Sequence, residues 1–154
     1  MKKVLIICLL CIMFITGCGN KTVTNKNSYS SKETIGDMHY IISKKPSEIK
    51  NNGEQVDGES RYHAIRYDYG DYYIVVKMQT EKIDKAFDYV DKEVNGIKYR
   101  YCADIGSGSG LEYSAIINYN NLYYSIEYFQ FHGRVTETSK QVYHDILESI
   151  SFKD

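Results

Sequence analysis

The chain has 154 residues, with 19 basic and 20 acidic residues and a formal net charge of −1. This balance excludes the strongly basic surfaces that bind nucleic acid, and the length suits one domain with a single core. Tyr is abundant at 16 residues, Pro occurs once and Trp is absent, a composition that with its many Lys, Asn and Ile residues is typical of an AT-rich genome.

The N-terminus has the pattern of a secretory signal peptide. Two lysines precede an apolar run over residues 4–15, which is too short to span a hydrocarbon core of about 30 Å. The run ends in Ile15-Thr16-Gly17-Cys18, which resembles the lipobox of bacterial lipoproteins. The resemblance implies a diacylglyceryl group on Cys18, cleavage just before it, and an anchored chain on the outer face of a Gram-positive cell membrane. A secreted protein that is cut elsewhere is the alternative.

The expected organisation has three parts: a signal peptide over residues 1–17, lipidated Cys18 with a flexible spacer over residues 18–36, and one domain over residues 37–154. The spacer is rich in Asn, Ser, Thr and Lys, so it cannot bury enough apolar surface to fold alone. Cleavage would leave 17 basic and 20 acidic residues, a net charge of −3. Cys102 would be the only thiol of the folded part, so no intramolecular disulfide is expected.

Alternation of apolar and polar residues predicts most of the strands. Two dipeptides, Gly70-Asp71 and Asn120-Asn121, lie between β-rich runs and predict tight hairpins. Between the first predicted strand and the second, a polar stretch with Gly53 and Gly58 is expected to be a loop. The predicted strands are residues 38–42, 62–69, 72–80, 97–103, 111–119 and 122–131.

Two helices are expected to cover one face of the sheet. Residues 81–94 carry apolar side chains at helical spacing. Residues 138–151 begin with Thr138 and Gln141, which fit a capping box, and continue with an apolar stripe that includes Ile146. The predicted fold is therefore α+β: a curved antiparallel sheet of five to six strands, with the C-terminal helix and one more helix packed on one face.

The C-terminal third also resembles known domains. A strand with the sequence YYSIEY is followed by a polar turn and a helix that closes on residues 146–150. This unit, within residues 94–152, resembles small uncharacterised domains of Gram-positive lipoproteins and is similar to the closing strand–helix unit of PsbP/Mog1-like domains. Many such domains carry Trp in this strand, where this chain has none. The resemblance implies a fold and a non-catalytic role, and it transfers no functional residues.

The residues that could perform chemistry do not form a motif. His144 and Glu148 are one helical turn apart, but an exposed ion pair explains that spacing as well as a metal or acid–base site does. The loop Gly106–Gly110 does not open a helix, as a phosphate-binding loop should. Cys102 fits a half-buried structural residue better than a nucleophile. We therefore predict no catalytic, cofactor-binding or metal-binding residues.

The tyrosines suggest a binding surface instead, because Tyr makes large amphipathic contacts at low entropic cost. The function expected is a non-enzymatic binding or accessory module for a protein or envelope component. The alternatives are a small envelope enzyme or ligand carrier with a cleft between sheet and helices, and a purely structural role. His63 or His132 beside Glu127 and Cys102 would favour an enzyme. The aromatic residues proposed for the surface are Tyr67, Tyr69, Tyr73, Tyr119, Tyr123, Phe129 and Phe131.

Overall fold

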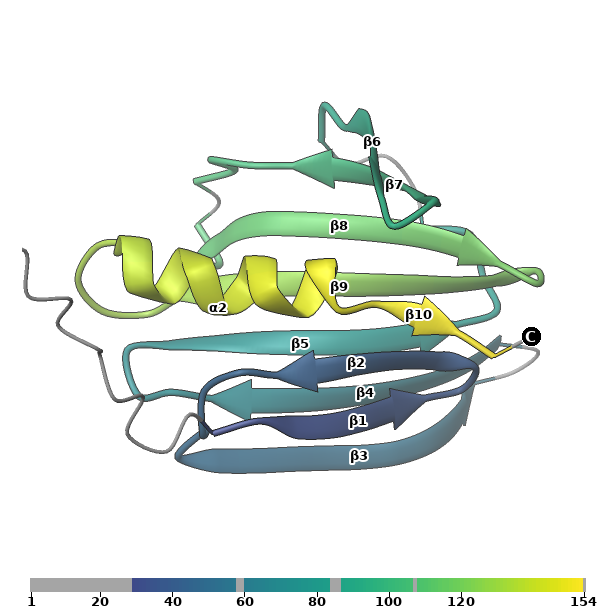
Figure 1. Ribbon diagram of the computed structural model, residues 1–154, viewed down its shortest axis with the longest axis horizontal. Helices are drawn as coiled ribbons and strands as arrows, with labels where there is room; N and C mark the ends of the chain where they lie inside the picture. The colour runs from purple at the N-terminus through teal and green to yellow at the C-terminus, as the bar shows by residue number, and fades with distance from the viewer. Residues whose placement is uncertain (1–28, 58–59, 84–86, 107, 154) are drawn as a thin grey trace, which may run out of the picture.

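The structure is a computed structural model that describes residues 29–57, 60–83, 87–106 and 108–153. The described residues form ten strands in two antiparallel sheets and one α-helix (Figure 1). No helix in this described part is both long and apolar enough to cross a membrane. The lipobox and Cys18 lie outside the described residues.

The large sheet has seven strands in the order β3-β4-β5-β9-β8-β7-β6, and the small sheet has three in the order β1-β2-β10. The strands of the large sheet are β3 (Glu48–Asp57), β4 (Ser60–Asp68), β5 (Tyr72–Gln79), β6 (Val90–Val94), β7 (Ile97–Cys102), β8 (Leu111–Tyr119) and β9 (Leu122–Gln130). The strands of the small sheet are β1 (Ser31–Ile35), β2 (Met38–Ile42) and β10 (Ser151–Phe152).

The two predicted hairpins are confirmed. Strands β4 and β5 pair across Gly70-Asp71, and β8 and β9 pair across Asn120-Asn121. Asn120 and Asn121 have φ angles of 49° and 62°, the left-handed values that a two-residue hairpin turn needs. The strands β2 and β7 are also found where alternation predicted them.

The small sheet and helix α2 (Glu137–Glu148) together cover one face of the large sheet (Figure 1). Two contacts show this arrangement: the Tyr40 hydroxyl of β2 lies 2.7 Å from the Tyr67 hydroxyl of β4, and the Tyr143 hydroxyl of α2 donates to the carbonyl of Ile126 in β9. The buried core lies between these layers. Eight of its side chains are tyrosines, so Tyr fills much of the space that Leu or Phe fills in other proteins. The buried tyrosines are Tyr40, Tyr67, Tyr72, Tyr101, Tyr113, Tyr124, Tyr128 and Tyr143.

The predicted fold class is wrong, because the described chain is mainly β and has two sheets rather than one. The helix expected over residues 81–94 is not found: residues 90–94 are strand β6, which pairs with β7 across Asn95-Gly96. These two turn residues have φ angles of 52° and 80°. The hairpin satisfies the backbone of residues 90–94 through cross-strand hydrogen bonds, and this outweighs the helical spacing of their apolar side chains.

Two polar segments were also assigned wrongly. The expected loop after residue 42 contains β3, an edge strand with a register shift between Asn51 and Glu54. An edge strand is exposed on several sides, so its polar sequence does not alternate. The expected spacer over residues 18–36 ends in β1, which pairs with β2 over its whole length.

Candidate functional site

The large sheet has a second face, opposite the core, which we call the open face. Neither the small sheet nor α2 covers it. Ile83 and Tyr89, which precede β6, lie against its β7–β8 part through Arg100 and Ser114. Strand register places Arg66 of β4 opposite Val75 of β5, Val75 opposite Glu127 of β9, and Glu127 opposite Ser114 of β8. All four residues belong to this face, since side chains alternate between the two faces of a sheet.

An aromatic–arginine cluster lies on the open face and consists of Arg66, Tyr73, Phe129 and Phe131. The rings of Tyr73 and Phe129, which are paired across β5 and β9, stack at a centroid distance of 4.6 Å with 6° between their planes. The Phe131 ring also lies 4.6 Å from the Tyr73 ring. The Arg66 guanidinium carbon is 3.8 Å from the Tyr73 ring centre, within the range of a cation–π contact.

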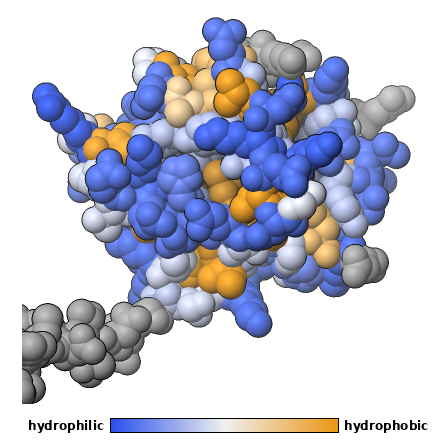
Figure 2. All heavy atoms as spheres, turned by 45° about the horizontal axis from the view of Figure 1, so that its top comes forward, coloured by the Kyte–Doolittle hydropathy of each residue, from blue (hydrophilic) through white to orange (hydrophobic). Residues whose placement is uncertain are grey.

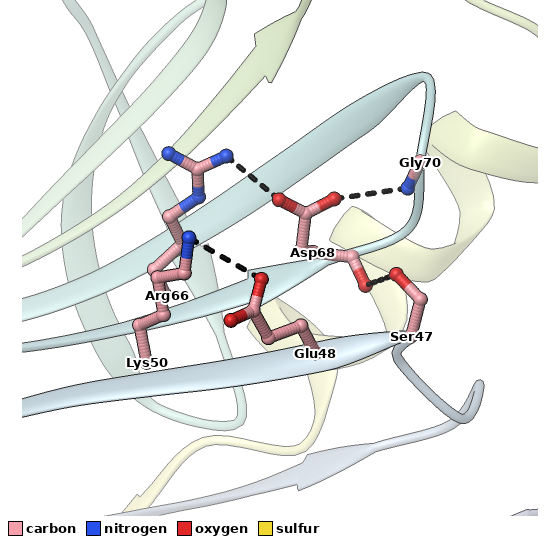
Figure 3. A network of polar contacts seen from close by, with 6 residues as sticks. All are labelled: Ser47, Glu48, Lys50, Arg66, Asp68 and Gly70. Carbon is pink, nitrogen blue, oxygen red and sulfur yellow. Dashed lines mark hydrogen bonds and ion pairs between the residues drawn. The ribbon is translucent and has the colours of Figure 1, made fainter.

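Asp68 holds the other side of Arg66 in place (Figure 3). Its carboxylate accepts hydrogen bonds from the Arg66 guanidinium, at 2.7 Å, and from the backbone amide of Gly70, at 2.9 Å. The Gly70 amide is the main reason that the pKa of Asp68 is lowered, and Arg66 lowers it further. On β3 beside them, Lys50 pairs with Glu48 at 3.2 Å. Arg66 is therefore fixed between a ring and a carboxylate before any partner binds.

Glu127 lies near the centre of the open face and is partly buried. Burial raises the pKa of Glu127, while the charge of Lys77 acts in the opposite direction. Beside Glu127, the Ser114 hydroxyl lies 3.0 Å from the Tyr89 hydroxyl. Cys102 of β7 pairs with Ser114 and is partly buried. Glu127 and Cys102 thus belong to one row across the sheet, with Ser114 between them.

The histidines do not join this row. His63 lies beside Asn51, 2.8 Å from its side-chain oxygen, and His132 is exposed after the end of β9. The arrangement that would have favoured an enzyme is therefore not found. His144 packs against the rings of Tyr101 and Tyr143, and burial lowers its pKa. Within the described ranges, no group of three or more His, Cys, Asp or Glu side chains could hold a metal ion.

The structure divides the aromatic residues that the sequence suggested for a surface. Tyr73, Phe129 and Phe131 form the cluster, and Tyr123 lies further along the same face. Tyr67 is fully buried in the core, Tyr69 is partly buried against Tyr72, and Tyr119 stacks on Phe152 of the small sheet. Tyr67, Tyr69 and Tyr119 are therefore not part of the surface.

Sequence reasoning missed Arg66 and Asp68. Both are on the polar side of a predicted strand, where a charged residue is common and carries no signal. Their only local signal is the i,i+2 spacing, which places both side chains on one face of β4.

The middle of the interface between the large sheet and α2 is filled. Tyr128 of β9 and the helical residues Tyr143 and Ile146 have no exposed side-chain surface. Figure 2 shows a mainly hydrophilic surface on which hydrophobic residues form several separate patches. A pocket of about 680 Å³ lies where the end of α2 and β10 meet β7 and β8, with Ile117, Ile150 and Phe152 in its lining.

Comparisons with protein-family models, with curated proteins and with solved structures found no match. The resemblance to lipoprotein domains and to the PsbP/Mog1-like unit stays a prediction. The site must be interpreted from its own geometry.

Proposed function

We propose that this chain is a membrane-anchored lipoprotein whose domain binds another protein at the outer face of the cell membrane, without catalysing a reaction. The anchor is the diacylglyceryl group expected on Cys18. The binding surface is the open face of the large sheet. The observation that carries the proposal is the aromatic–arginine cluster of Arg66, Tyr73, Phe129 and Phe131.

This cluster has the composition of a protein-binding hot spot, in which Tyr and Arg are enriched. Phe131 is 48% exposed although it is large and apolar, and Tyr73 and Arg66 beneath it are held by stacking and by Asp68. A side chain that is already ordered loses little conformational entropy when it binds. The cluster therefore offers one exposed apolar anchor on a rigid base.

The test is cross-linking in intact cells that express the full anchored chain, followed by mass spectrometry. We expect one reproducible partner with the wild-type chain. Phe131→Ala should reduce the yield of the cross-linked partner by about tenfold or more, because truncating a hot-spot side chain costs about 2 kcal/mol or more of binding free energy. The matched control is Ile49→Ala, which removes an apolar side chain that is 50% exposed on β3, away from the cluster.

Ile49→Ala should leave the yield unchanged when both variants are present in the membrane at wild-type amounts. Failure to find any partner would contradict the proposal, and so would equal yields from the two variants.

A further inference from the structure

A second feature of the open face is a cleft of about 790 Å³ at the β6–β7 end of the large sheet. We call it the basic cleft. Its lining has four basic and two acidic residues. The Lys92 ammonium lies 4.0 Å from the Tyr101 ring centre on the core side of the sheet, so the charged groups on the open face sum to +1. The mature chain is expected to carry −3, so the basic cleft opposes the charge of the rest of the domain. The charged residues of its lining are Lys82, Lys92, Lys98, Arg100, Asp91 and Glu93.

The basic side chains of the cleft differ in how firmly they are held. The Arg100 guanidinium donates to the carbonyl of Ile83 at 3.4 Å and lies 5.4 Å from the Tyr89 ring centre, so its position is set by the protein. Lys82 and Lys98 are exposed, and neither forms an ion pair within the described part of the chain. Register places Lys98 opposite Glu93, so a ligand would compete with that carboxylate for the Lys98 charge. Lys82 precedes β6 and has no cross-strand neighbour among the described residues.

The floor of the basic cleft is not charged. Ile116 of β8 is almost fully buried at its base, and Asn118 and Tyr123 lie beside it. Arg100 pairs with Ile116 across β7 and β8, which brings the fixed guanidinium over an apolar floor. This lining suits a ligand that has both anionic groups and aliphatic surface, as Asp and Glu side chains on a peptide do.

The two acidic residues of the lining narrow the choice of ligand. Asp91 and Glu93 are on the same face of β6, one pleat apart, and both are exposed. Their carboxylates would repel a polymer that carries a negative charge at every unit. A peptide can place neutral or basic side chains there and acidic side chains opposite the lysines. We propose that the basic cleft binds an acidic segment of the partner protein, an inference that rests on the proposed function.

The test measures binding of fluorescein-labelled hexaglutamate to the full chain in detergent micelles by fluorescence anisotropy. The wild-type chain should bind hexaglutamate, bind hexalysine weakly, and lose affinity for hexaglutamate as salt is raised. Lys82→Glu with Lys98→Glu should weaken binding by about tenfold or more. The control, Lys32→Glu with Lys153→Glu, changes the net charge by the same amount at exposed positions outside the cleft, and it should change the affinity by less than about twofold.

Each other outcome has a defined meaning. No binding of hexaglutamate, or equal losses in the two double variants, would overturn the inference. Inorganic polyphosphate could instead bind more tightly than hexaglutamate and depend on Lys82 and Lys98. The ligand of the cleft would then be an anionic polymer, and the proposed acidic peptide segment would be wrong. If the cellular cross-link still depends on Phe131 but survives the change at Lys82 and Lys98, the proposed function stands and the acidic segment is wrong.

Discussion

Among the acidic residues that the structure describes, Glu127 is the one whose carboxylate is partly buried near the centre of the open face. Its charged form is disfavoured because burial removes water from the carboxylate, and the charge of Lys77 offsets only part of this cost. The native state therefore binds the proton of Glu127 more tightly than the unfolded chain does. Between the unfolded and the native pKa, rising pH must lower the free energy of unfolding.

Replacing Glu127 with Gln should therefore stabilise the domain at pH 7 and above, because Gln carries no charge to desolvate. The gain should disappear as the pH falls toward 4.5, the ordinary pKa of Glu, where Glu127 is protonated in the native state as well. Thermal unfolding at a series of pH values measures this.

Glu148→Gln is the control for this prediction. Glu148 is at the exposed C-terminal end of α2, and its replacement should change stability by less than about 0.5 kcal/mol. A melting temperature of Glu127→Gln that is lower than wild type at neutral pH would show that the attraction of Lys77 exceeds the cost of burial.

Among the elements, helix α2 shows how one polar residue determines where a helix begins. The capping box predicted at Thr138 and Gln141 is wrong, because the helix begins earlier. The N-cap is Thr136: its hydroxyl accepts from the amide of Ser139 at 3.1 Å, and the Ser139 hydroxyl accepts from the amide of Thr136 at 3.0 Å. Two overlapping Thr-x-x-polar patterns are present, and in the structure the first of them forms the cap.

Thr136→Ala should lower the free energy of unfolding by about 0.5–2 kcal/mol, the usual cost of losing an N-cap side chain. Thr138→Ala is the matched control. Thr138 is exposed inside the first turn, so its replacement should change stability by less than about 0.5 kcal/mol. Urea unfolding measures both variants. A larger loss in Thr138→Ala than in Thr136→Ala would place the cap where the sequence pattern suggested.

At the scale of the whole molecule, the two faces of the large sheet have different roles. One face, covered by the small sheet and α2 (Figure 1), holds the core. The other face carries the aromatic–arginine cluster and the basic cleft. Both features lie on the same face, so one partner could engage both. The proposed lipid on Cys18 would tether the domain through β1, which belongs to the small sheet on the opposite side of the large sheet.

The anchor has a direct test. Cys18→Ala should release the chain from the membrane fraction or leave it unprocessed, because no diacylglycerol could attach. Cell fractionation with mass spectrometry of the N-terminal peptide measures both outcomes. Cys102→Ala removes the only other thiol outside the signal segment and should stay in the membrane. A Cys18→Ala chain that is still membrane-bound and cut at the same position would refute the lipid anchor.

Local patterns in the sequence were enough to predict the strands β2, β4, β5, β7, β8 and β9, their two hairpin turns and the C-terminal helix. Each depends on residues close together in the chain, where a period of two or a turn dipeptide acts directly on the backbone. The same rules failed for β3 and β6, which are edge strands with polar sequences. There, pairing with one neighbour outweighs local preference.

The candidate site depended on contacts that local patterns do not contain. Alternation shows that Tyr73 and Phe129 each lie on one side of a strand, but not that β5 and β9 are neighbours. Their pairing joins strands that are separated in sequence by three other strands, and it brings Phe129 to Tyr73. The predicted hairpin of β4 and β5 brings Arg66 to Tyr73. Tyr67 is buried because β2 of the small sheet packs on β4, where the Tyr40 hydroxyl meets the Tyr67 hydroxyl, and no local pattern predicts that contact. The alternation of side chains along a strand determines which residues share a face of the sheet. The order of the strands, which only the tertiary structure decides, determines which residues from other strands lie beside them.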